Sequence, residues 1–229
     1  MNYLDFEKVL SVPRIGRYKS ACNGDEQKSL ELYFLNIEIS KDFYTLLCLF
    51  EIALRNAINE HYKEHFADNS WLINQTLKGF FPPDNKRVEN EYNKLLSERK
   101  YSHDKLIAAL TFGVWIEMFS SHCFAKGSQT LLKIFPNRQK GINQKAIQKE
   151  LKEIAKFRNK VAHYEPVCFD IDGKISAIYA QNALEKTLKY FTFLGVPENL
   201  LCKFNKTENN LEKLKKLQES LGRGEESFS

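Results

Sequence analysis

Apolar residues recur at helical spacing along most of this 229-residue chain. Between Glu26 and Phe66 they return every three or four positions, and Ser40, followed by a lysine and an aspartate, has the composition of a helix start. We therefore expect two helices that meet near Ser40. The second carries one continuous apolar face, formed by Leu46, Leu47, Phe50, Ala53, Leu54, Ala57 and Ile58.

The rest of the chain reads mainly as shorter helices. A helix over residues 2–11 should stop before Pro13, and the following stretch, PRIGRYKSACNGDEQ, has the composition of a basic loop. Residues 67–83 break the helical pattern and contain Trp71 and two prolines. Further helices are predicted over residues 84–100, 103–124, 144–163, 178–194 and 207–221. Asn143 is placed to cap the helix that starts at 144, and the Asp-Gly pair in FDIDGKISAIYA predicts a small turn or hairpin.

Composition favours helix over strand, because glycine (10 residues) and proline (6 residues) are scarce while leucine, lysine and glutamate are frequent. We expect an all-α bundle with few or no strands. It should form a single domain over residues 1–221, with an insertion over about 67–141, followed by a tail without fixed structure at 222–229.

Charge and cysteine content limit the partners and the compartment. The net charge of +5 is too small for a dedicated duplex-DNA binder, permits an RNA substrate, and equally fits an ordinary excess of lysine. The five cysteines are scattered and form no CxxC, which argues against a disulfide framework and points to the cytoplasm. No segment has the length of a signal peptide or a membrane span. His61 and His65 lack the intervening glutamate of a zinc protease, so no metal site is predicted.

The stretch IAKFRNKVAHYEPV, residues 154–167, concentrates polar chemistry at a helix end. Arg158 shares a stripe at three- and four-residue steps with Ile147, Leu151, Ile154, Ala155 and Ala162, which puts it on or beside the core-facing side. Asn159 and His163 are four apart on the neighbouring stripe, together with Lys152 and Lys156. Arg158 and His163 are roughly 140° apart on an ideal helix, so one chain holds this pair imperfectly and a second copy would complete the site.

These residue types suit RNA cleavage by transesterification. Histidine serves as the general base for a 2′-hydroxyl or as the acid for the leaving oxygen, arginine stabilises the phosphorane, and asparagine orients either group. In a two-fold dimer, two His163 copies would supply base and acid, with two Arg158 copies at the phosphate. The alternative is structural: His163 caps helix carbonyls, and Arg158 pairs with a buried carboxylate such as Glu51.

RNKVAH resembles the RNxxxH form of the motif of the HEPN superfamily. The longer FRNKVAHYEP is similar to the signature of the Abi-like family, the AbiD/AbiF-type abortive-infection proteins of bacteria. LSVPRIGRY, then LYFLNIEISKDFYTLLCLFEIALRNAINEHY, then Trp71, are similar to that family's N-terminal block, so the resemblance covers most of residues 8–170. Tyr164 departs from the pattern, because many relatives carry a second histidine there.

The resemblance implies an α-helical HEPN bundle that dimerises and forms a composite, metal-independent ribonuclease site without a cofactor. It implies a toxin-like role in phage defence, with Arg158 and His163 catalytic and Asn159 as their polar assistant. A regulatory or guide-like RNA, or an antitoxin, is a further partner consistent with it. The rival hypotheses are a non-catalytic HEPN-type module that binds RNA or a nucleotide, and a purely structural interaction protein.

Several other residues are candidates for supporting roles. Glu51, Arg55 and Asn59 lie at i, i+4 and i+8, either as an intrahelical ion pair or as an edge that packs beside the Arg158 helix. Lysines near the motif and one tyrosine are candidate RNA contacts: Lys152, Lys156, Lys160 and Tyr164. Another set could follow a phosphate backbone or simply be solvated: Arg14, Arg17, Lys19 and the lysines of EKLKKLQ.

Overall fold

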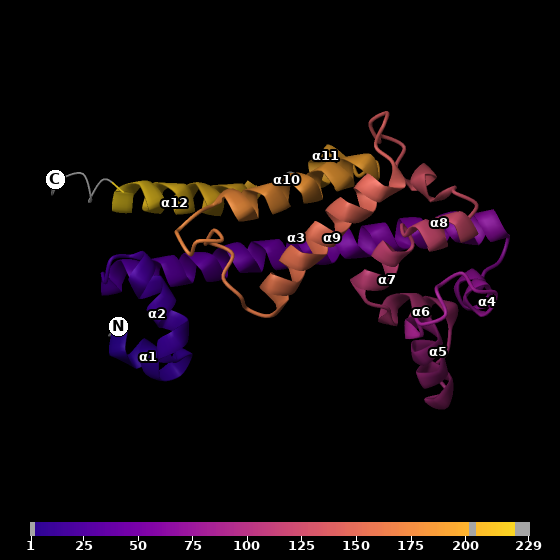
Figure 1. Ribbon diagram of the computed structural model, residues 1–229, viewed down its shortest axis with the longest axis horizontal. Coiled ribbons are helices and arrows are strands. Elements are labelled where there is room, and N and C mark those ends of the chain that lie inside the picture. Colours follow the sequence, from indigo (N-terminus) through magenta and orange to yellow (C-terminus); the bar gives the residue numbers. More distant parts are fainter. Residues whose placement is uncertain (1–2, 202–204, 223–229) are drawn as a thin grey trace. The chain divides into compact units, whose positions relative to one another are not determined.

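The computed structural model describes residues 3–201 and 205–222, and within them the fold is all-α, as predicted (Figure 1). This part of the chain holds twelve α-helices, one 3-10 helix and no strand. The α-helices are α1 (Tyr3–Leu10), α2 (Val12–Ala21), α3 (Glu26–Phe66), α4 (Trp71–Leu77), α5 (Arg87–Ser97), α6 (His103–Ala109), α7 (Phe112–Glu117), α8 (Ser121–Lys126), α9 (Gln144–Ala162), α10 (Ile178–Phe193), α11 (Glu198–Leu201) and α12 (Asn205–Gly222), and the 3-10 helix is η1 (Leu131–Ile134).

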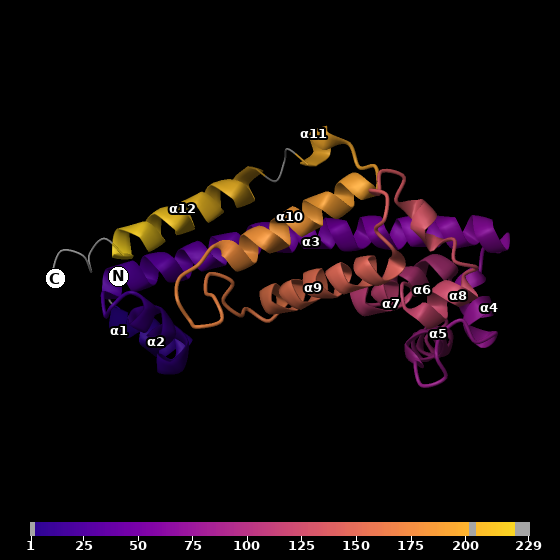
Figure 2. The ribbon, with the colours of Figure 1, turned by 45° about the horizontal axis from the view of Figure 1, so that its top comes forward.

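The first of two compact units comprises residues Met1–Leu47, Phe157–Lys186 and Glu198–Ser229. In it, α1 and α2 lie beside the start of α3, and α12 runs along the same part of α3 (Figures 1 and 2). Asn210 of α12 donates a 2.8 Å hydrogen bond to Asp42 of α3. The buried rings of Phe43 and Phe157 lie 4.6 Å apart, a contact worth about 1 kcal/mol beyond simple burial.

The second unit comprises residues Cys48–Lys156 and Thr187–Pro197. Its aromatic core gathers around Tyr62 on α3, whose ring lies 4.9 Å from Trp71 and 5.4 Å from Phe80. Gly127 is required beside this core, because a Cβ atom there would come within 2.2 Å of the Tyr62 hydroxyl. The prediction of one domain with an insertion over about 67–141 stays a prediction.

The predicted break near Ser40 is wrong, because α3 is a single helix of 41 residues. No glycine or proline interrupts Glu26–Phe66, and buried positions continue at three- and four-residue steps through Asn36, Ile39 and Phe43. Ser40 therefore lies inside a helix whose packing is continuous. The local resemblance to a helix start was overridden by this unbroken apolar face.

The basic loop predicted after Pro13 is also wrong, since residues 12–21 form α2. Pro13 stands in the first turn, where a missing N–H costs no hydrogen bond. Ile15 and Tyr18, one turn apart, are both buried and hold α2 against the rest of the first unit. Helix α2 therefore holds Arg14 and Arg17 in defined positions on the surface of the first unit.

The region expected to be irregular, residues 67–83, contains the seven-residue helix α4. The apolar segment over residues 103–124 is three short helices, α6 to α8, rather than one. Ser102 and Ser120 accept hydrogen bonds from the N–H groups of Lys105 (3.2 Å) and Cys123 (3.3 Å), which starts α6 and α8 anew.

Other predictions are confirmed. Asn143 caps α9 by accepting a 3.0 Å hydrogen bond from the N–H of Ala146. Phe169 and Ile175 form an isolated antiparallel bridge around the Asp-Gly turn. Helices α5, α10 and α12 fall where the pattern predicts them. Of the predicted tail at 222–229, Gly222 ends α12, and residues 223–229 lie outside the described part of the chain.

No helix in the described ranges is both long enough and apolar enough to span a bilayer.

Candidate functional site

The polar motif lies at the C-terminal end of α9, which closes with a compact capping turn. The N–H of Tyr164 donates to Val161 O (3.2 Å), and the N–H of Glu165 donates to Lys160 O (2.9 Å). This hydrogen-bond pair is a Schellman motif, with His163 at the C-cap and Tyr164 at the following left-handed position (φ 59°). Glycine usually occupies that position, and a bulky aromatic residue there is strained. Strain of this kind is found preferentially at functional sites.

His163 and Asn159 are exposed, and Arg158 is half-buried. Arg158 Nη1 lies 3.4 Å from Asn159 Oδ1, so the asparagine orients the guanidinium rather than the imidazole. The backbone N–H of His163 still donates to Asn159 O (2.9 Å), which keeps the residue in helical register. No other described side chain hydrogen-bonds the imidazole, so both of its nitrogens face solvent or a ligand.

The buried stripe of α9 differs slightly from the predicted one. Its members are Ile147, Leu151, Ile154, Phe157 and Val161. Ala155, Arg158 and Ala162 are half-buried along its edge. Arg158 is therefore beside the core rather than in it, with its charged group on the motif side.

Helix α2 forms the opposite wall of a surface hollow of about 270 Å³ at His163. Pro13, Arg14 and Arg17 line it from α2, and His163 and Glu165 line it from the end of α9. Arg14 Nη2 donates to the backbone carbonyl of Tyr164, which ties α2 directly to the strained turn. Two guanidinium groups against one carboxylate make this hollow cationic, as a phosphate site requires.

Three contacts fix the surroundings of the hollow. The guanidinium of Arg17 sits 4.6 Å from the centre of the Phe169 ring, a cation–π contact, and buried Tyr18 packs 5.1 Å from the same ring. Asn36, buried in the middle of α3, accepts a 2.8 Å hydrogen bond from the N–H of Val167. The segment after Pro166 is thereby anchored to α3, which holds the turn at His163 in place.

Sequence reasoning did not single out Asn36, although an asparagine inside an apolar helical pattern was a usable signal. For Arg14 and Arg17, the sequence predicts either contact with a phosphate backbone or simple solvation. Their position opposite His163 could not be read from a sequence separation of 150 residues.

The predicted supporting residues fall into two groups. Lys152 and Lys156 are exposed on the same row of α9 as Asn159 and His163, and Tyr164 is 72% exposed. Lys160 is half-buried with Nζ 5.0 Å from the centre of the Tyr179 ring. Lys160 and Tyr164 belong to the first unit, whereas Lys152 and Lys156 belong to the second unit. Glu51 and Arg55 also belong to the second unit, where Arg55 Nε lies 3.4 Å from Asn56 Oδ1. Their predicted packing beside the motif stays a prediction.

Cys168, the cysteine nearest to His163 in the sequence, is buried and is not an accessible nucleophile. Burial raises the pKa of the Cys168 thiol, five residues after His163, to about 12, and that of Cys123 to about 11. At neutral pH both remain thiols, which are poor nucleophiles. His163 is the residue that brings an imidazole to the lining of the hollow.

The two histidines on α3, His61 and His65, contact Thr130 and each other. His61 Nε2 is 2.9 Å from Thr130 Oγ1, and His65 stacks parallel to it at 6.0 Å. Across residues 3–201 and 205–222, no three histidine, cysteine or acidic side chains gather closely enough to hold a metal ion.

No family model matches this chain, and comparison with curated proteins and with solved structures gives no match either.

Proposed function

We propose that this protein is an endoribonuclease of the HEPN superfamily, of the Abi-like type, which cuts RNA in abortive infection. The observation that carries the proposal is the exposed imidazole of His163 in a hollow whose other wall presents Arg14 and Arg17. An imidazole next to fixed guanidinium groups can move a proton at a phosphodiester while the developing charge is neutralised.

The steps follow ordinary transesterification. His163 removes the proton from a 2′-hydroxyl, the resulting alkoxide attacks the adjacent phosphorus, and the P–O bond to the 5′-oxygen breaks. The leaving oxygen takes a proton from a protonated imidazole. The products are a 2′,3′-cyclic phosphate and a 5′-hydroxyl. Arg158, oriented by Asn159, holds a non-bridging phosphate oxygen.

One imidazole cannot be base and acid in the same turnover unless it carries the proton across, so we place a second His163 from a homodimer at the site. Exposed apolar side chains at this end of the first unit support such a contact. Ile171 is 100% exposed and Ile178 is 68% exposed, and both line one hollow together with Lys160. Apolar groups left in water this way mark interaction surfaces.

The test of catalysis uses the purified full chain and labelled single-stranded RNA in EDTA. Wild type should generate new 5′-hydroxyl ends and 2′,3′-cyclic phosphates. Arg158→Ala should lower the rate about 100-fold or more. The matched control is Lys78→Ala, which removes an exposed cation of the second unit. Tight RNA binding without any new ends would instead favour the non-catalytic binding module.

The test of the dimer uses Ile178→Glu. Because Ile178 is the first residue of α10, a glutamate there suits the helix dipole and leaves the fold intact. The variant should be monomeric by light scattering and should lose cleavage. A monomeric variant with full activity would overturn the composite site and leave the single-chain chemistry standing.

A further inference from the structure

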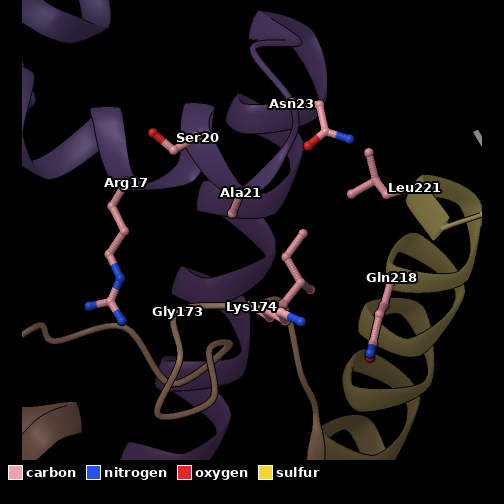
Figure 3. Close-up of a pocket in the computed structure, with 9 residues that line it drawn as sticks. Arg17, Ser20, Ala21, Asn23, Gly173, Lys174, Gln218 and Leu221 are labelled. Atoms are coloured by element: carbon pink, nitrogen blue, oxygen red, sulfur yellow. The ribbon is translucent and has the colours of Figure 1, made fainter. Parts of the chain in front are cut away.

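A second, larger hollow of about 670 Å³ lies on the first unit, and Figure 3 shows the residues that line it. It adjoins the hollow that contains His163, because Arg17 lines both. Three segments enclose it: the end of α2 with Asn23, the turn at Gly173 and Lys174, and the last part of α12 with Gln218 and Leu221. Its polar side chains, which include Arg17 and Ser20, are all exposed, so it is accessible to a ligand from solvent.

Arg17 belongs to both hollows. Its guanidinium is held against Phe169 and is therefore fixed before any ligand binds. A ligand with several linked phosphates that occupies one hollow can therefore extend past Arg17 into the other.

The lining of the larger hollow suits one kind of ligand. Its described lining presents two cations, two side-chain amides and a hydroxyl, and none of the described lining residues carries a carboxylate. Ile175 and Leu221 add apolar surface to this lining. Phosphates together with unpaired bases match this mixture of cations, amides and apolar groups, because amides can bond base edges only when the bases are not paired.

We infer that the larger hollow binds the nucleotides of a single-stranded RNA that adjoin the cleaved phosphodiester. Arg17 and Lys174 contact backbone phosphates, and the amides of Asn23 and Gln218 reach base edges or 2′-hydroxyls. This inference rests on the proposed function, and it extends the substrate from one phosphodiester to a strand of several nucleotides.

The experiment measures RNA binding by fluorescence anisotropy in a His163→Ala background, which prevents cleavage. Lys174→Ala should weaken binding of a mixed-sequence RNA of about 16 nucleotides by roughly two- to fivefold. Lys174→Glu should weaken it further. The slope of log K against log salt should become shallower by about 0.7 for the lost phosphate contact. The loss should shrink for an RNA of about 4 nucleotides, which cannot fill both hollows.

Lys78→Ala, at an exposed lysine of the second unit, is the control in the same background and should change neither affinity nor salt slope. Equal losses in the Lys78 and Lys174 variants, or no loss in the latter, would overturn the inference. The outcome is separable from that of the proposed function. If wild type cuts RNA but Lys174→Glu binds normally, only the larger hollow is rejected. If wild type never cuts but Lys174→Glu loses RNA, only the nuclease is rejected.

Discussion

The two units each contain an asparagine beside a histidine, and the two pairs are built in opposite ways. In the second unit, Asn59 is buried, and its Oδ1 accepts hydrogen bonds from Trp71 Nε1 (3.0 Å) and His103 Nε2 (2.9 Å). In the first unit, Asn159 and His163 are exposed, and the imidazole has no described side-chain partner. A histidine whose N–H is used inside the protein stabilises the fold, whereas one whose nitrogens are free is available for chemistry.

Replacing each histidine by alanine should give the largest contrast. His163→Ala should lower RNA cleavage by about 100-fold to 10,000-fold, the usual contribution of an acid–base group, with an unchanged melting temperature. His103→Ala should lower the melting temperature and keep the activity per folded molecule. Cleavage assays and thermal unfolding on the same preparations measure both. If His163→Ala alone is unstable, the division between a structural and a chemical histidine is wrong.

Replacing each asparagine by alanine should give the same contrast between an effect on stability and an effect on cleavage. Asn59→Ala removes the acceptor of the buried Trp71 N–H and of the half-buried His103 N–H, so the free energy of unfolding should fall by about 2 to 4 kcal/mol. Asn159→Ala is an exposed change and should stay within about 0.5 kcal/mol of wild type, while cleavage falls because Arg158 loses its orienting group. Urea unfolding of both variants provides the comparison. An Asn59→Ala protein as stable as wild type would contradict a structural role for the buried pair.

Lowering the pH should reduce the contribution of His103 and Asn59 to the free energy of unfolding. Burial, the largest cause, lowers the pKa of His103, and its Nδ1 is buried without a hydrogen-bond partner among the described residues. The unfolded chain takes up this proton near pH 6.5, before the folded chain does. The free energy of unfolding should therefore fall as the pH drops below about 6.5, until the lowered folded pKa is passed.

Urea unfolding at several pH values should show this fall in wild type and a smaller one in His103→Gln, since glutamine does not titrate. Part of the fall remains in the variant because burial also lowers the pKa of His61. An identical pH dependence in the two proteins would assign the acid sensitivity to other groups.

The strained turn at the exposed pair should give the smallest effect. Tyr164→Gly relieves the left-handed backbone, which should raise the free energy of unfolding by up to about 1 kcal/mol after the entropy of the extra glycine is counted. Tyr164→Ala keeps the strain while removing the exposed ring, so it serves as the control. A glycine variant less stable than the alanine variant would show that the turn is not strained.

Sequence reasoning reached the helical fold, the cap at Asn143 and the polar end of α9, because each depends on local spacing. It failed at Ser40 and at Pro13, where a local signal competes with packing that only the folded chain reveals. Phe157 and Val161 were missed in the buried stripe for a similar reason: the apolar face of α9 drifts around the helix as it nears its end. The contribution of α2 to the His163 hollow depends on contacts between distant segments, which no local pattern contains.

The tie between Arg14 and the carbonyl of Tyr164 spans 150 positions, and this separation has a consequence during synthesis. During translation, Arg14 and Arg17 are synthesised early, and His163 is synthesised much later. A polypeptide terminated before Arg158 would carry Arg14 and Arg17 without the imidazole of His163, so the proposed cleavage site exists only in the finished chain.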